Sequence, residues 1–95
     1  MCPPTYYDIE YEINPWMNVQ NKANKDAAQE QYDGLKKVYS DLGIMVSEME
    51  PVKGLPDMVY SANFGHAENN LFIPANFKFD ERKKESAFAE EYFRS

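Results

Sequence analysis

A carboxylate and a carboxamide stand six residues apart in this 95-residue chain, at Asp57 and Asn63. Asp57 follows Pro56 and precedes an apolar stretch that we expect to be a strand. It would therefore lie in the loop at the start of that strand, and binding groups concentrate in such loops. Strand alternation would place Asn63 on the same face. A carboxylate held there could pair with a planar guanidinium, and an asparagine adds a donor and an acceptor. The alternative is that Asp57 only forms a turn.

The other side chains with chemical potential have no obvious partners nearby in the sequence. Cys2 is the single cysteine, which excludes an internal disulfide or a cysteine-based zinc site. Nothing close to it would lower a thiol pKa, so we interpret it as a small buried side chain. His66 follows Gly65 in a polar stretch and is interpreted as an exposed turn histidine rather than a catalytic one. We assign no catalytic residue, metal ligand or cofactor.

The composition indicates one small folded domain with an acidic surface. The chain is 43% hydrophobic and 27% charged, which is typical of a globular protein. Sixteen acidic residues outnumber ten basic ones, giving a net charge of −6, which argues against nucleic-acid and membrane-surface partners. No apolar run approaches the roughly 20 residues needed to span a bilayer, and no secretory signal pattern is present. We therefore expect a soluble, cytoplasmic protein.

The hydrophobic periodicity predicts an α/β order of strand, helix, strand, strand, strand and helix. Residues 5–13 alternate apolar and acidic side chains, as a half-buried strand does. Within residues 23–42 the apolar side chains recur in steps of four and three, which lines one helical face, and Gly43 follows as a stop. The remaining expectations are strands at 44–46, 58–60 and 71–73, a turn at 64–70, and a helix from about residue 80.

The C-terminal helix pattern runs to the last residues, 92–95, without a following glycine or proline. Helices commonly end at such residues. The pattern is typical either of the opening portion of a longer protein or of a small domain whose terminal helix is frayed.

Two segments carry a family resemblance: the opening MCPPTYYDIEYEINPWM and the later GLPDMVYSAN. Both resemble the start of the guanidino-group-modifying enzymes, which include dimethylarginine dimethylaminohydrolase, arginine deiminase and the amidinotransferases. The likeness is greatest to the branch that contains the bacterial arginine dihydrolases. It implies the pentein fold, an α/β propeller of five ββαβ modules. Residues 1–95 would then be the N-terminal portion of such a domain, about its first one to two modules.

The resemblance also implies roles for four residues. Asp57 matches the family aspartate of the substrate site, and Asn14 matches a substrate-contacting asparagine. Asn63 matches the dihydrolase asparagine that contacts the guanidino group, whereas dimethylargininases have Glu-Asp in place of Ala62-Asn63. Arg82 matches the arginine that binds the substrate α-carboxylate. From the residues alone, Arg82 belongs to a charged run typical of a solvated first helical turn.

Catalysis in this family uses a cysteine nucleophile and a histidine from later modules, and neither Cys2 nor His66 matches them. The resemblance therefore implies an N-terminal portion of an arginine-guanidine hydrolase that contributes substrate contacts, bound to arginine or a related guanidino compound and to the remaining propeller modules. Whether the chain alone is an enzyme stays open. The alternative is a non-catalytic module that completes a split enzyme or binds an arginine-like ligand. The sequence does not separate arginine, dimethylarginine and amidino acceptors, and it does not reveal the oligomeric state.

Overall fold

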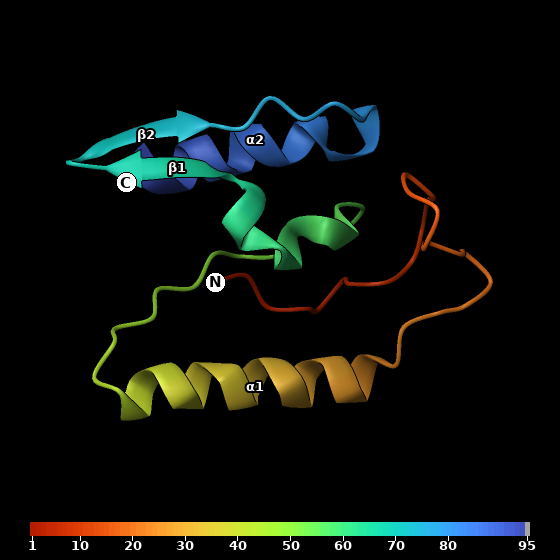
Figure 1. Ribbon diagram of the computed structural model, residues 1–95, viewed down its shortest axis with the longest axis horizontal. Coiled ribbons are helices and arrows are strands. Elements are labelled where there is room, and N and C mark those ends of the chain that lie inside the picture. The colour runs from red at the N-terminus through yellow and green to blue at the C-terminus, as the bar shows by residue number, and fades with distance from the viewer. Residues whose placement is uncertain (95) are drawn as a thin grey trace.

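The computed structural model describes residues 1–94, which form an α/β arrangement of two helices, two 3₁₀ turns and one β-hairpin. Helix α1 lies along one side of the molecule, and the hairpin lies with α2 along the other (Figure 1). The N-terminal segment and the two 3₁₀ helices pass between these layers. The elements are α1 (Lys25–Asp41), η1 (Pro56–Val59), η2 (Ser61–Asn63), β1 (Gly65–Glu68), β2 (Leu71–Pro74) and α2 (Asp80–Arg94).

Helix α1 forms where the periodicity predicts it, and both of its ends are capped. The side chain of Asn24 accepts a hydrogen bond from the Ala27 amide at 3.0 Å, which satisfies a free amide of the first turn. At the other end, Gly43 has φ +78° and the Ile44 amide donates back to the Tyr39 carbonyl, as in a Schellman motif. The predicted helix and its glycine stop are confirmed.

The predicted strand at residues 5–13 is wrong, because turns occupy this segment. The Tyr7 amide donates to the Pro4 carbonyl, and the Asp8 carboxylate accepts from the amides of Ile9 and Ala23. These bonds hold the pKa of Asp8 below its usual value, the Ala23 amide more than the Ile9 amide. Side chains satisfy local backbone groups here, as Asp does in turns, so alternation alone does not make a strand.

The predicted strands at 44–46 and 58–60 are also wrong. Residues 44–46 have no assigned secondary structure, and the nearest strand-like bonds lie just beyond, where the Met1 amine donates to Ser47 and the Met49 amide donates to Met1. Residues 58–60 fall in and after η1, which begins at Pro56. Proline suits a first helical position because its φ is fixed and it needs no acceptor.

The hairpin accounts for the next two predictions. The strand predicted at 71–73 is confirmed as β2, but part of the turn predicted at 64–70 is strand β1, which pairs antiparallel with β2. Only Asn69 and Asn70 form the tight turn, with φ of 51° and 63°. Two positive φ values define the hairpin turn type in which Asn is favoured.

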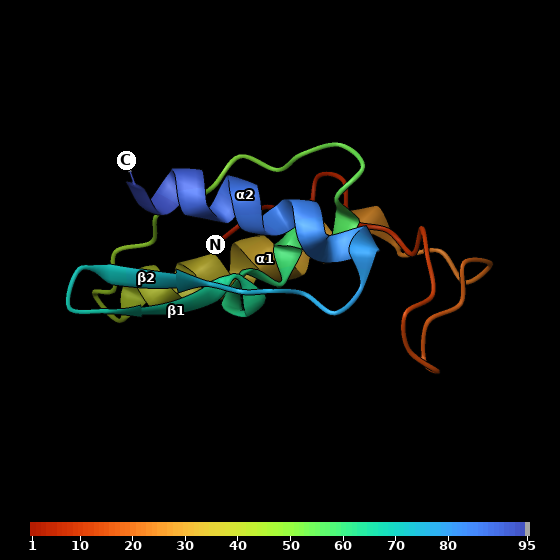
Figure 2. The same cartoon turned by 90° about the horizontal axis from the view of Figure 1, so that it is seen from above.

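Helix α2 begins at Asp80 as predicted and packs over the hairpin (Figure 2). Beneath it lies the small core, in which Cys2, Met58 and Ala89 are almost fully buried. This confirms the interpretation of Cys2 as a small buried side chain. The other core side chains are Met49, Leu55 and Phe64. No helix in residues 1–94 is long and apolar enough to cross a membrane.

Candidate functional site

Asp57 and Asn63 lie on the two consecutive 3₁₀ helices, η1 and η2, rather than along one strand. The Tyr60 amide donates to the Asp57 carbonyl and the Asn63 amide donates to the Tyr60 carbonyl, each at 3.0 Å. This coiled backbone is compact, and Asp57 is only 5% exposed whereas Asn63 is exposed. The strand geometry expected for the pair is therefore wrong, but the two residues share a common partner.

That partner is Arg82, near the start of α2. Its guanidinium donates from Nη2 to the Asp57 carbonyl and from Nη1 to Asn63 Oδ1, both at 3.1 Å. Its Nε and Nη2 also bind the two carboxylate oxygens of Glu85 at 2.9 and 2.8 Å. The Phe77 ring lies 4.4 Å from the guanidinium carbon, within cation–π range. Arg82 thus joins two of the predicted site residues.

The environment of Arg82 differs from that of a solvated helical turn. Its side chain is 11% exposed and that of Glu85 is fully buried. Burial by itself lowers the pKa of Arg82, but the hydrogen bonds and charge of Glu85 outweigh it and the pKa is raised. Arg82 therefore stays a cation, as arginine does throughout proteins.

The Asp57 carboxylate has its own partner in the N-terminal segment. The Tyr11 hydroxyl donates to Asp57 Oδ2 at 2.6 Å, across 46 residues of chain. Burial and then the Asp57 hydrogen bond raise the pKa of Tyr11 well above its usual value, so Tyr11 remains a neutral donor. Asp57 Oδ1 accepts no hydrogen bond from the described residues 1–94.

Arg82, Asp57, Asn63, Glu85 and Tyr11 form a polar cluster linked by hydrogen bonds. Its charges add up to an excess of one negative charge. Arg82 is positive, and the carboxylates of Asp57 and Glu85 are negative when ionised. A low-dielectric site with a surplus carboxylate favours a cationic ligand. Glu85 and Tyr11 are the members that the sequence analysis missed. The spacing of three residues between Arg82 and Glu85 is a signal that a helix would pair them, whereas nothing local points to Tyr11.

Asn14 makes hydrogen bonds within its own turn. Its Oδ1 accepts from the amides of Trp16 and Met17 at 3.0 and 3.1 Å, which closes a turn. It borders a hollow of about 480 Å³ that Tyr7 and Lys22 also line. The structure of residues 1–94 therefore brings together Asp57, Asn63 and Arg82, whereas the hydrogen bonds of Asn14 in these residues are local.

Neither Cys2 nor His66 is arranged for catalysis in the described residues. Burial raises the pKa of the Cys2 thiol to about 11, which leaves it a poor nucleophile at neutral pH. The exposed His66 ring lies 3.3 Å from the Glu68 carboxylate on β1, so its predicted exposure is confirmed although it lies in a strand. No group of three or more metal-ligating side chains occurs among residues 1–94.

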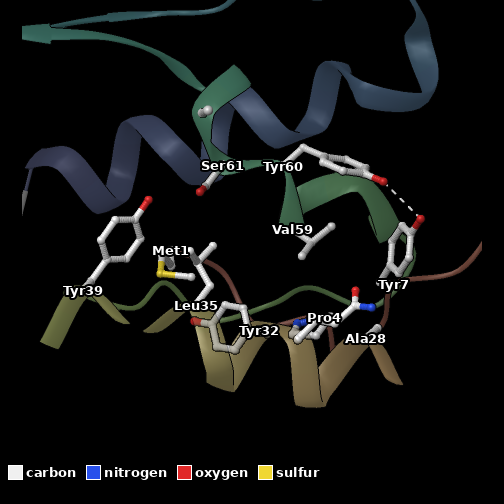
Figure 3. Close-up of a pocket in the computed structure, with 12 residues that line it drawn as sticks. Met1, Pro4, Tyr7, Ala28, Tyr32, Leu35, Tyr39, Val59, Tyr60 and Ser61 are labelled. Carbon is white, nitrogen blue, oxygen red and sulfur yellow. Dashed lines mark hydrogen bonds between the residues drawn. The ribbon is translucent and has the colours of Figure 1, made fainter. Parts of the chain in front are cut away.

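A groove of about 510 Å³ separates α1 from the 3₁₀ helices. Leu35 and Tyr39 line it from α1 and Val59 lines it from η1, while the hydroxyls of Tyr7 and Tyr60 meet across one end at 3.0 Å (Figure 3). None of the four candidate binding residues lines this groove. The groove is therefore distinct from the polar cluster around Arg82.

Comparisons of the sequence with known proteins find relatives whose names indicate related reactions. No family model matches the chain. It is 43% identical over 86 residues to N(G),N(G)-dimethylarginine dimethylaminohydrolase of Mycobacterium tuberculosis, covering 90% of this chain and 28% of that protein. It is 38% identical over 94 residues to the bifunctional arginine dihydrolase/ornithine cyclodeaminase AgrE of a Nostoc species, covering 98% of this chain and 13% of AgrE.

Solved structures agree with these relatives. A crystal structure of an AgrE mutant with L-arginine matches 99% of this chain and 14% of its own, with a TM-score of 0.92 and 38% identity. The product-bound N-terminal domain of ArgZ, a cyanobacterial arginine dihydrolase, matches 99% of this chain and 34% of its own, with a TM-score of 0.90 and 33% identity.

These relatives are a dimethylarginine dimethylaminohydrolase and arginine dihydrolases, and the matched regions of AgrE and ArgZ have the fold described above. The chain is therefore similar to the N-terminal region of arginine dihydrolases and of a dimethylarginine dimethylaminohydrolase, which agrees with its resemblance to the guanidino-group-modifying superfamily. It spans less than a third of the two curated relatives named here.

Proposed function

We propose that this chain forms part of the guanidino-binding wall of an arginine-hydrolysing enzyme with a pentein propeller fold. Residues 1–95 would supply the N-terminal portion of the propeller domain, and a cytoplasmic location remains part of the proposal. The proposed substrate contacts are Asn14, Asp57, Asn63 and Arg82.

One observation carries the proposal: Arg82 binds both Asp57 and Asn63, inside a cluster with one surplus negative charge. The free oxygen of Asp57 is proposed to face the ligand guanidinium, with Asn63 beside it. Arg82 is proposed to contact the ligand carboxylate. The AgrE mutant with bound L-arginine supports an arginine-type ligand for this chain.

The chemical step requires groups beyond those described. The buried Cys2 thiol, with its pKa raised to about 11, does not suit attack on a guanidinium carbon, which needs a thiolate. The nucleophile and the acid–base group are therefore proposed to come from further propeller modules. These modules would belong either to the same polypeptide or to a separate subunit.

The test is calorimetric binding of L-arginine and agmatine, which lacks a carboxylate, to protein expressed from the complete reading frame. Asp57→Asn removes a charge opposite the guanidinium and should weaken both ligands at least about tenfold, because breaking a paired buried charge is costly. Arg82→Ala should weaken arginine far more than agmatine. Glu90→Gln is the control, because Glu90 makes an exposed ion pair with Arg94 on the same helix.

Equal losses of both ligands in Arg82→Ala would refute the carboxylate role of Arg82. Unchanged binding of both ligands in Asp57→Asn would refute the site. Where the expressed protein turns over arginine, Asn63→Asp adds a charge beside the reacting carbon and should shift the balance between ornithine and citrulline.

A further inference from the structure

We propose that Glu85 is a positioning residue that fixes which edge of Arg82 can meet a ligand. The inference rests on the proposed function, because it concerns how the same site holds an arginine-type compound. It goes beyond that function by assigning a role to a fully buried carboxylate, and by predicting a single-bonded rather than a forked contact with the ligand.

The hydrogen bonds of Arg82 show which of its N–H groups is free to contact a ligand. A guanidinium carries five N–H groups. The Nε group and one Nη2 group bind Glu85, the second Nη2 group binds the Asp57 carbonyl, and one Nη1 group binds Asn63. One N–H of Nη1 remains without an acceptor among residues 1–94.

Two other approaches to Arg82 are occupied, one side of its guanidinium by Phe77 and one edge by Glu85. The Phe77 ring lies over the guanidinium at 4.4 Å, so that face is covered. The Nε–Nη2 edge is the fork that usually grips a carboxylate with two parallel bonds, and here it grips Glu85. A ligand carboxylate therefore reaches Arg82 through the one free N–H of Nη1, next to Asn63.

Glu85 suits this role because it is buried and its carboxylate is committed to Arg82. Its side chain is fully buried, and both of its oxygens are used by Arg82. Replacing Glu85 by Gln turns one oxygen into a donor that faces the donors of Arg82. Arg82 would then have to leave its present orientation, and the free Nη1 group would no longer point beside Asn63.

The first measurement uses the unmodified protein, expressed from its complete reading frame, and follows the Arg82 Nε–H signal by NMR. The signal is assigned from its loss in Arg82→Lys. In the ligand-free protein this proton should exchange slowly with water, because Glu85 holds it. Addition of L-arginine should leave the signal in place. A large shift with arginine but not with agmatine would show that the ligand carboxylate takes the fork, and would overturn the proposal.

The second measurement compares affinities in variants. Glu85→Gln should lower the preference for arginine over agmatine by about tenfold, the order of one charge-assisted hydrogen bond. Adding Glu85→Gln to Arg82→Ala should lower that preference no further, since the two residues act as a unit. Glu90→Gln should leave it unchanged. An unaltered preference in folded Glu85→Gln, or additive losses in the double variant, would overturn the proposal.

Further measurements cover two cases: a Glu85→Gln variant that does not fold, and an unmodified protein that binds neither ligand. Where Glu85→Gln does not fold, Arg82→Met/Glu85→Met replaces the whole pair by apolar groups, a change that buried pairs often tolerate. This variant should fold and show the same loss of preference as Arg82→Ala. Absence of binding of both ligands to the unmodified protein would refute the proposed function, while the Nε–H exchange rate would still decide whether Glu85 holds Arg82.

Discussion

Tyr11→Phe deletes a single oxygen atom and tests whether the N-terminal segment is held by its contact with Asp57. The hydroxyl donates to Asp57 Oδ2 at 2.6 Å, and Asp57 is only 5% exposed. A hydrogen bond to a charged group contributes roughly 1.5–3 kcal/mol, and the carboxylate oxygen left behind has limited access to water. We expect the free energy of unfolding to fall by about 2 kcal/mol, which for a domain of this size lowers Tm by roughly 8–16 °C.

The control is Tyr7→Phe, which removes an exposed hydroxyl from its 3.0 Å bond with Tyr60. Both substitutions are Tyr→Phe, and both break a contact between the N-terminal segment and the region of η1. The control should cost well under about 1 kcal/mol, because water replaces the lost bond. Urea unfolding, followed by circular dichroism and Trp16 fluorescence, measures both. Equal small losses would show that the Tyr11 bond does not hold the segment, and the reasoning from its burial would be refuted.

Three further predictions concern the chain as a whole. Gly34→Ala should raise stability by about 0.5–1 kcal/mol in the exposed middle of α1, while Gly43→Ala, at φ +78°, should lower it; opposite signs in thermal melts confirm this, and equal signs contradict it. Burial raises the pKa of the Cys2 thiol from 9.0 to about 11, so its contribution to stability should be complete below pH 9 and disappear as pH rises through 11. Cys2→Ala should not show this loss. Citrulline release from arginine that vanishes in Cys2→Ala would contradict the interpretation of Cys2 as a non-catalytic thiol. Leu71 and Ile73 are 73% and 67% exposed on the hairpin, so the 95-residue chain should self-associate in sedimentation runs, and Leu71→Thr/Ile73→Thr should reduce this; a monodisperse monomer would argue against it.

The sequence predicted the elements that have strong local signals. The helical steps of four and three, ended by Gly43, define α1 because packing faces and caps are encoded within a few residues. The alternation over residues 5–13 misled, since the same pattern occurs where Asp8 caps turns. Period-two alternation indicates a strand only when a neighbouring strand supplies the hydrogen-bond partners.

The expected pairing of Asp57 and Asn63 assumed a strand, where the structure has two 3₁₀ helices. Arg82 contacts both residues, through the backbone carbonyl of Asp57 and the side-chain Oδ1 of Asn63. These contacts do not depend on a shared side-chain face, so the strand reasoning could not have predicted them. The composition alone indicates a solvated Arg82, because charged runs are usually solvated. Its contacts with buried Glu85, with the Asp57 carbonyl and with Asn63 distinguish it from such a run.

The part of the site that could not be predicted is held by contacts between distant segments. Tyr11 meets Asp57 across 46 residues, and Arg82 meets the Asp57 carbonyl across 25. No periodicity reports such pairs, because each depends on how the N-terminal segment, the 3₁₀ helices and α2 are packed together. The cluster therefore forms only once those three segments are in place. It follows that loss of the Tyr11 bond should disturb the carboxylate proposed to face the ligand, although Tyr11 itself is not proposed to touch that ligand.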